Sequence, residues 1–155
     1  MAKRWLHNLL SDRSGTSTIE LAIIFPVLAA LTFIAADLAM AFKAKIRLQA
    51  AAERTAQLAT SGGLNSAAYQ NLAADAAAGA GVSSNAVTVT SSLLCDGTVQ
   101  ASMAEVCATG QQMKRYVTIG ITGSYQPMFG RLLPGTSWAS AQGITLTGSS
   151  SVRLQ

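Results

Sequence analysis

The chain has few of the side chains on which enzymes and metal sites depend. Charged residues make up 12% of its 155 residues, against about 25% in an average soluble protein, and its one histidine is His7. If the chain is cleaved beyond His7, no histidine remains, which excludes Ser-His and Cys-His nucleophile systems. Two cysteines and a distant histidine are too few ligands for a metal site. We therefore expect no enzyme, no cofactor and no metal.

Basic residues outnumber acidic ones, and the formal net charge is +4. No basic stripe is interleaved with aromatic residues, which are only 6% of the chain, so we expect no nucleic-acid partner. A short basic stretch follows the long apolar run and consists of Lys43, Lys45, Arg47 and Arg54. These side chains either contact anionic lipid headgroups or form the solvated flank of a helix.

The two cysteines, Cys95 and Cys107, have eleven residues between them. If this part of the chain lies outside the cytoplasm, we expect them to form a disulfide. Closing a loop of this length contributes about 3 kcal/mol in the chain-entropy model. In a reducing compartment they would instead be two buried thiols.

A long apolar run extends from Ile19 to Phe42, and residues 21–36 contain no charge. About 20 helical residues cross a bilayer core of about 30 Å, so the run is long enough to span a membrane. Glu20 and Asp37 lie near its two ends, where a carboxylate can reach the interface. We expect Glu20 to fall in the first helical turn, where the helix dipole favours a negative charge. A short N-terminal flank and a long C-terminal part favour a cytoplasmic N-terminus.

Three interpretations of this run compete. It could be an uncleaved signal anchor, or a secretory signal peptide cut after Ala39-Met40-Ala41, which would release a chain beginning at Phe42. The run is longer than the apolar core of about 7–15 residues typical of signal peptides, which argues against the second interpretation. In the third interpretation the chain is cut before the run, at Gly15.

Residues 13–25, RSGTSTIELAIIF, resemble a class of type IV prepilins in which a basic leader ends in glycine. Cleavage after that glycine leaves an acidic residue at the fifth mature position, so Gly15 would precede the cut, Thr16 would become the N-terminus and Glu20 would be fifth. The string IELAIIFPVLAAL further resembles the N-terminal signature of the TadE-like family of Tad pilus minor pseudopilins. Leu21 departs from this pattern, because such proteins usually have Phe or Tyr there.

The resemblance implies a structural and assembly subunit of a Tad-type type IV pilus, acting in pilus biogenesis and adhesion. It implies cleavage by a prepilin peptidase between Gly15 and Thr16, and pairing of Glu20 with the freed amine during assembly. The implied partners are the bacterial inner membrane, other pilin or pseudopilin subunits and pilus assembly proteins. The chain would cross the inner membrane once, with a periplasmic C-terminal domain, and the pilus or cell surface would be a further location. The alternative is a signal-anchored or secreted periplasmic binding domain, with Glu20 a plain interfacial carboxylate.

The remaining pattern predicts an α+β fold. We expect a leader over residues 1–15, a membrane and spine helix over 16–60, and an extracytoplasmic domain over 61–155. The spine helix would be about 67 Å long. One face of its second half is expected to be buried, and it carries Leu48, Ala51, Ala52, Thr55 and Ala59. A second helix would begin at Asn65 or Ser66 and end at Gly79 and Gly81, although a flexible linker is the alternative.

From residue 85 the apolar period changes to two, which indicates three or four half-buried antiparallel strands. The alternating segments lie around residues 87–90, 117–122, 144–147 and 152–154. Turns are expected at residues 126–130 and 133–135. Tyr125, Phe129 and Trp138 form either an exposed adhesive surface or anchors of the core and turns. The Tyr-x-Pro-x-Phe segment and the Trp-containing loop also resemble the C-terminal part of TadE-like proteins.

Overall fold

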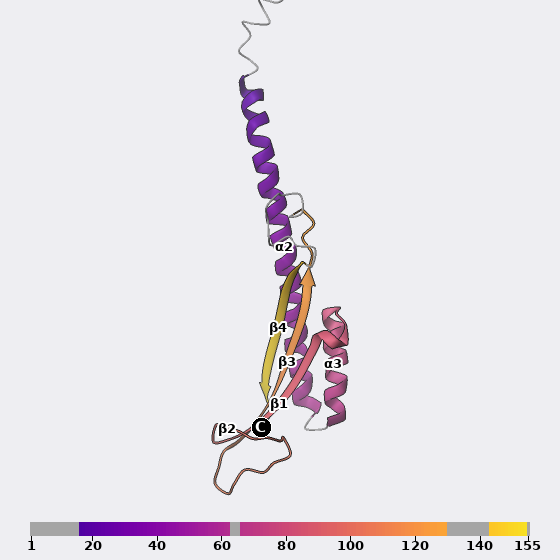
Figure 1. The fold of residues 1–155 in the computed structure, drawn as a ribbon, viewed down its shortest axis with the longest axis vertical. Helices are drawn as coiled ribbons and strands as arrows, with labels where there is room; N and C mark the ends of the chain where they lie inside the picture. The colour runs from indigo at the N-terminus through magenta and orange to yellow at the C-terminus, as the bar shows by residue number, and fades with distance from the viewer. Residues whose placement is uncertain (1–15, 63–65, 130–142, 155) are drawn as a thin grey trace, which may run out of the picture.

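The computed structural model describes residues 16–62, 66–129 and 143–154. It consists of a long helix, a short helix and an antiparallel sheet, so the expected α+β fold is confirmed. The long helix α2 (Thr16–Gly62) extends well beyond the rest of the described chain, and the other elements pack along its C-terminal half (Figure 1).

Helix α2 runs through 47 residues without a break, including Pro26. At about 1.5 Å per residue it is about 70 Å long. Pro26 cannot donate a backbone hydrogen bond to Ala22, yet the helix continues on both sides. The Thr32 hydroxyl donates to the Leu28 carbonyl oxygen at 2.6 Å, which satisfies a polar group inside the apolar run.

Helix α3 (Ser66–Ala80) is the predicted second helix, and it runs back alongside α2 (Figure 1). Gly79 lies within it rather than at its end, and Gly81 forms the terminus. Gly81 adopts φ +70°, and the Val82 amide donates to the Ala77 carbonyl oxygen at 3.0 Å. This is the bond pattern of a Schellman terminus, which favours glycine because of its left-handed backbone. The short 3-10 helix η2 (Ser84–Ala86) then leads into the sheet.

The sheet has four antiparallel strands in the order β2-β1-β3-β4. Their bounds are β1 (Val87–Cys95), β2 (Thr98–Val99), β3 (Met113–Tyr125) and β4 (Ile144–Arg153). The apolar segment expected near 144–147 and the first two residues of the one near 152–154 belong to the single strand β4, which ends just before Leu154. The predicted loop between the cysteines contains the short strand β2. Asp96 and Gly97, both with positive φ, form the two-residue turn before it, and an Asp-Gly pair is a sequence signal for such a hairpin.

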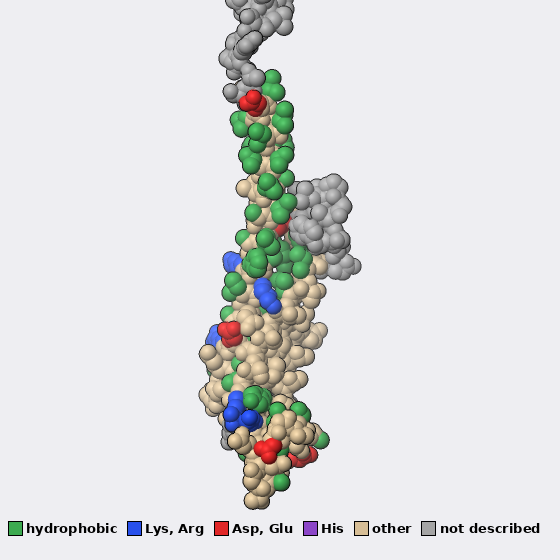
Figure 2. All heavy atoms as spheres, turned by 90° about the vertical axis from the view of Figure 1, so that its left-hand side faces the viewer, with side chains coloured by type: hydrophobic (Ala, Val, Ile, Leu, Met, Phe, Trp, Pro, Cys, Tyr) green, Lys and Arg blue, Asp and Glu red, His purple; other side chains and the backbone are tan. Residues whose placement is uncertain are grey.

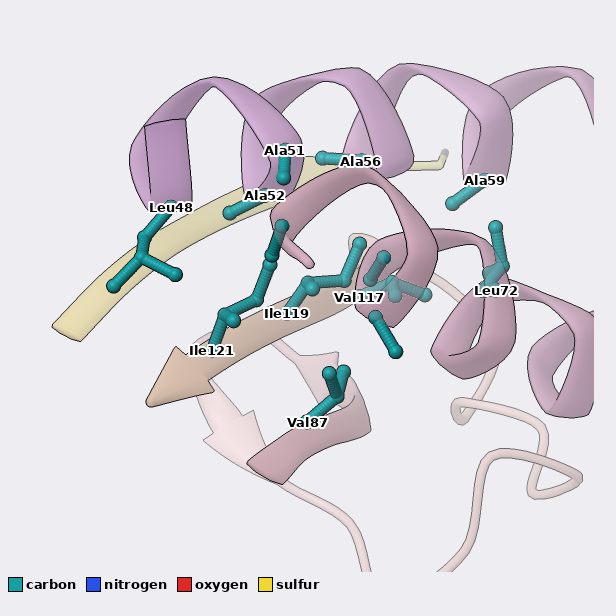
Figure 3. Close-up of a cluster of buried hydrophobic side chains, with 13 residues drawn as sticks. Leu48, Ala51, Ala52, Ala56, Ala59, Leu72, Val87, Val117, Ile119 and Ile121 are labelled. Atoms are coloured by element: carbon teal, nitrogen blue, oxygen red, sulfur yellow. The ribbon is translucent and has the colours of Figure 1, made fainter. Parts of the chain in front are cut away.

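The hydrophobic core lies between one face of the sheet and the two helices (Figure 3). All five residues predicted for the buried face of α2 are at most 7% exposed. Opposite them the β3 residues Val117, Ile119 and Ile121 are almost fully buried, and Leu72 and Ala76 contribute from α3. Because α2 and α3 present mostly alanines to this core, both helices can approach the sheet closely.

Two glycines bring the sheet against α2. A Cβ added to Gly148 in β4 would lie 2.6 Å from the Leu48 carbonyl carbon and 2.7 Å from the Gln49 nitrogen. A Cβ at Gly123 in β3 would lie 3.1 Å from a Leu48 methyl group. Backbone atoms cannot move aside as a flexible side chain can, so Gly148 fixes the distance between β4 and α2.

Candidate functional site

The N-terminal end of α2 contains the predicted processing and assembly residues. Gly15 lies outside the described residues, and Thr16 is the first residue of α2. The expectation that Glu20 falls in the first turn is wrong, because the helix already begins at Thr16 and the first turn holds no acidic residue. Glu20 is exposed one turn further on. Positions 16 and 20 are four apart and about 6 Å apart along the axis, so they lie on one helix face.

The first half of α2 exposes apolar side chains in all directions. Exposed fractions reach 69% at Ile23 and 64% at Phe25, and Figure 2 shows apolar side chains covering this part of the molecule. We call residues 18–34 the bare segment. Within α2 lies a stretch long and apolar enough to cross a membrane, and none of it is buried by the rest of the described chain. An apolar surface of this size requires lipid or partner helices around it.

The bare segment ends where the domain attaches to α2 through Asp37. This carboxylate is only 2% exposed. It accepts hydrogen bonds from the Met128 amide at 2.8 Å, the Phe129 amide at 2.9 Å and the Tyr125 hydroxyl at 3.2 Å. Charge-assisted bonds of this kind are about twice as strong as neutral ones. We call Asp37 together with residues 125–129 the Asp37 clip.

At the end of the bare segment, one turn before Asp37, Phe33 is still 46% exposed, but one face of its ring stacks on that of Phe129, with centroids 4.7 Å apart and planes inclined by 17°. Pro127, in the same turn, is buried. The Tyr-x-Pro-x-Phe segment is thus an anchor on α2, which favours the second interpretation given to Tyr125 and Phe129. Trp138 and residues 133–135 lie outside the described residues. The sequence predicts Asp37 at the lipid interface, whereas the structure buries its side chain against the turn at residues 125–129.

The clip makes the domain sensitive to alkaline pH through Tyr125. Burial, the hydrogen bond to Asp37 and the negative charge of that carboxylate raise the pKa of Tyr125 above its ordinary value. The folded state therefore favours the neutral phenol. The stabilisation is complete below the ordinary tyrosine pKa of about 10 and is lost as pH rises through the raised value.

We expect Tyr125→Phe to weaken this loss of stability above pH 10, since a phenylalanine ring has no proton to lose. Urea unfolding of the detergent-solubilised chain between pH 8 and 11.5 measures the effect, with Tyr116→Phe as the matched control. An unchanged alkaline slope in Tyr125→Phe would contradict the coupling of this phenol to Asp37.

Beyond the clip, side chains of α2 bind the backbone of the edge strand β4. The Gln49 amide donates to the Ser149 carbonyl oxygen at 3.0 Å and accepts from the Ser149 amide at 3.2 Å. The Lys45 ammonium donates to the Thr147 carbonyl oxygen. Unpaired edge groups can recruit foreign strands, so these contacts close part of the edge. No periodicity in the sequence identifies Gln49, because its partner is backbone 100 residues away.

The basic stretch serves several contacts. Besides Lys45, Arg47 donates from Nε to the Gly79 carbonyl oxygen at 3.5 Å, near the C-terminus of α3 where the helix dipole favours a cation. Lys43 and Arg54 are exposed and make no hydrogen bond or ion pair with the chain as far as it is described. The stretch is therefore divided between structural contacts and solvent-facing charge.

At the opposite end of the molecule, Cys95 and Cys107 form a disulfide with Cα atoms 5.5 Å apart. Cys95 ends β1 and is 4% exposed, so the bond fastens the loop after β2 to the sheet. Val99 in β2 and Val106 in this loop are exposed. In residues 16–62, 66–129 and 143–154 no group of three His, Cys, Asp or Glu residues could hold a metal ion.

The long helix matches the model of a known protein family. Residues 15–57 match the model of the family described as TadE-like protein, which confirms the resemblance over this segment. The match includes Gly15, Glu20 and Asp37 and covers most of α2, but ends before α3. No curated protein and no solved structure matches the chain.

Proposed function

We propose that this chain, whose α2 helix matches the TadE-like family, is a minor pilin-like subunit of a Tad-type type IV pilus. In this proposal it has a structural and assembly role, contributes to surface adhesion and has no catalytic role. The observation that carries the proposal is the position of the family match. It falls on a helix whose first half is bare and apolar and whose second half is the spine of an α+β domain.

This division of α2 fits two environments in succession. Before assembly, the bare segment and its flanks lie in the inner membrane, with the N-terminus cytoplasmic and the sheet domain periplasmic. After assembly, helices of neighbouring pilin or pseudopilin subunits replace the lipid around the same side chains. The alanines and Thr32 in this segment allow helices to approach closely. Both environments remove the apolar side chains from water.

Processing by a prepilin peptidase is the second part of the proposal. Cleavage between Gly15 and Thr16 would create a charged amine at the start of α2. Glu20, one turn away, could pair with this amine in its own chain or in a neighbour. In an apolar setting the attraction between the two charges is strong, and either charge left alone is costly. The pair would therefore set the register between subunits.

We expect Glu20→Ala to leave membrane insertion unchanged and to reduce surface piliation by about tenfold or more, because an unpaired charge buried among helices costs about 3–5 kcal/mol. Glu20→Gln tests the charge at nearly constant shape. Glu105→Ala is the matched control, since Glu105 is an exposed carboxylate in the loop closed by the disulfide. Immunoblots of membranes and counts of pili by electron microscopy give the two readouts. Normal piliation in Glu20→Ala would refute the role of Glu20 and favour a signal-anchored binding domain.

A further inference from the structure

A groove with a volume of about 340 Å³ opens where the sheet domain meets α2. It lies between α2, the C-terminal end of α3 and the ends of β3 and β4 that face the bare segment. In Figure 1 these ends of α3 and β3 lie on the side of the domain toward the N-terminus of α2. The polar side chains that line the groove belong to Lys43, Arg47, Ser124 and Tyr125. We call this the basic groove.

The charge in the basic groove is of one sign. Lys43 and Arg47 line it, and no Asp or Glu is among its lining residues. Along α2 the carboxylate closest to Lys43 is Asp37, which is buried and accepts three hydrogen bonds in the clip. The carboxylate closest to Arg47 is Glu53, which is exposed, does not line the groove and accepts a hydrogen bond from Gln49. Lys43 makes no hydrogen bond or ion pair with the chain as described. The groove therefore holds an uncompensated ammonium group beside a guanidinium.

The Arg47 guanidinium is held in place from one side. Its Nε donates to the Gly79 carbonyl oxygen, and a Cβ at Gly81 would lie 2.6 Å from one of its terminal nitrogens. Gly81 thus leaves room for the guanidinium to reach the groove. A guanidinium has five N–H donors, so several remain for an anion after this one bond. The hydroxyl of Ser124, which is exposed, is a further donor on the β3 side.

The position of the groove along α2 indicates which kind of anion could reach it. Met40, the first lining residue, lies about 5 Å past Asp37 along the helix axis, and Arg47 lies about 15 Å past it. If the bare segment fills the hydrocarbon core, the headgroup layer begins near Asp37 and extends about 5–8 Å further. Lys43, about 9 Å past Asp37, can reach back into that layer with its long side chain. Figure 2 shows Lys and Arg side chains appearing where the domain begins, beyond the apolar part of the helix.

We propose that the basic groove binds the phosphate group of an anionic phospholipid from the leaflet next to the domain. The Lys43 ammonium and the Arg47 guanidinium neutralise the phosphate, and the Ser124 hydroxyl donates to one of its oxygens. Met40 and Leu146, which also line the groove, lie against the apolar part of the lipid. Such a contact fixes the height of the domain above the membrane. This inference rests on the membrane anchoring in the proposed function and is independent of pilus assembly.

The test measures lipids retained by the full-length chain. The chain is extracted in mild detergent, mixed with equal amounts of phosphatidylglycerol and phosphatidylcholine, and examined by native mass spectrometry. We expect the wild type to retain phosphatidylglycerol preferentially and Lys43→Gln to reduce this preference about fivefold, as for the loss of one cation at an anionic membrane surface. Arg54→Gln, an exposed cation of α2 that does not line the groove, should leave the preference unchanged.

Inorganic phosphate distinguishes a lipid site from a general anion site. We expect phosphate at about 10-fold excess over lipid to leave the retained phosphatidylglycerol unchanged, because the acyl chains and the helix share one apolar phase. Displacement of the lipid by phosphate would overturn the lipid assignment. Equal losses in Lys43→Gln and Arg54→Gln, or no preference in the wild type, would overturn the site itself. The lipid measurement needs only the extracted chain. The lipid-binding proposal therefore stands or falls independently of whether Glu20→Ala changes piliation.

Discussion

Asp37→Asn is expected to release the Tyr125–Phe129 segment from α2. The carboxylate accepts the Met128 amide on one oxygen and the Phe129 amide on the other. Asparagine has one acceptor oxygen and one NH₂ group, so one backbone amide would face another donor. A hydrogen bond to a charged group contributes about 1.5–3 kcal/mol, so opening of the clip should become about 10- to 100-fold more frequent. Hydrogen exchange of the Met128 and Phe129 amides measures this directly.

The matched control is Asp75→Asn, which removes an exposed carboxylate from α3. Exchange at Val117 and Ile119, in the centre of β3, should stay slow in both variants because the core does not depend on the clip. If Met128 and Phe129 exchange at the wild-type rate in Asp37→Asn, the carboxylate does not anchor this segment. Fast exchange throughout β3 would instead mean that Asp37 supports the entire domain.

Gly148→Ala is expected to destabilise the packing of β4 on α2 by about 1–3 kcal/mol, the usual cost of overpacking a well-filled interface. The added methyl group would meet the backbone of Leu48 and Gln49, and the two elements would have to separate. That separation would also weaken the two hydrogen bonds between Gln49 and Ser149. For a domain of about 100 residues, the melting temperature should fall by about 5–20 °C, as measured by circular dichroism in detergent.

Gly79→Ala makes the same chemical change, but we expect it to change the melting temperature in the opposite direction. A Cβ at Gly79 would meet the Ala51 methyl group at 3.6 Å, an ordinary contact distance. Alanine within a helix is favoured over glycine by about 1 kcal/mol, so this variant should melt slightly above the wild type. Equal melting temperatures in Gly148→Ala and the wild type would contradict the close approach of β4 to α2.

Periodicity was sufficient to predict the helices and the main strands. The offsets of Leu48, Ala51 and Ala52 depend only on the 3.6-residue repeat, and the structure buries all three. The alternation around Val117 and Ile119 likewise predicts their inward side chains, because successive residues in a strand face opposite sides. The length of β4 was missed because Gly148 and Ser150 occupy its inward positions and break the apolar pattern.

The contacts that attach the domain to α2 could not be read from the sequence. The neighbours of Asp37 in the sequence suggest a carboxylate at the lipid interface. Its partners lie about 90 residues later, and two of them are backbone amides, which nearly every residue type supplies. Gln49 was missed for the same reason. By contrast, the predicted processing site is a local pattern made of Gly15, Thr16 and Glu20, so the sequence alone reveals it. Cleavage at this site stays a prediction.

The most direct test of the account is the N-terminal sequence of the mature protein isolated from membranes. If α2 is kept as the anchor and cleavage occurs between Gly15 and Thr16, the sequence begins at Thr16 with Glu20 as its fifth residue. A water-soluble protein beginning at Phe42 would contradict it, because the bare segment would then have been removed with a signal peptide.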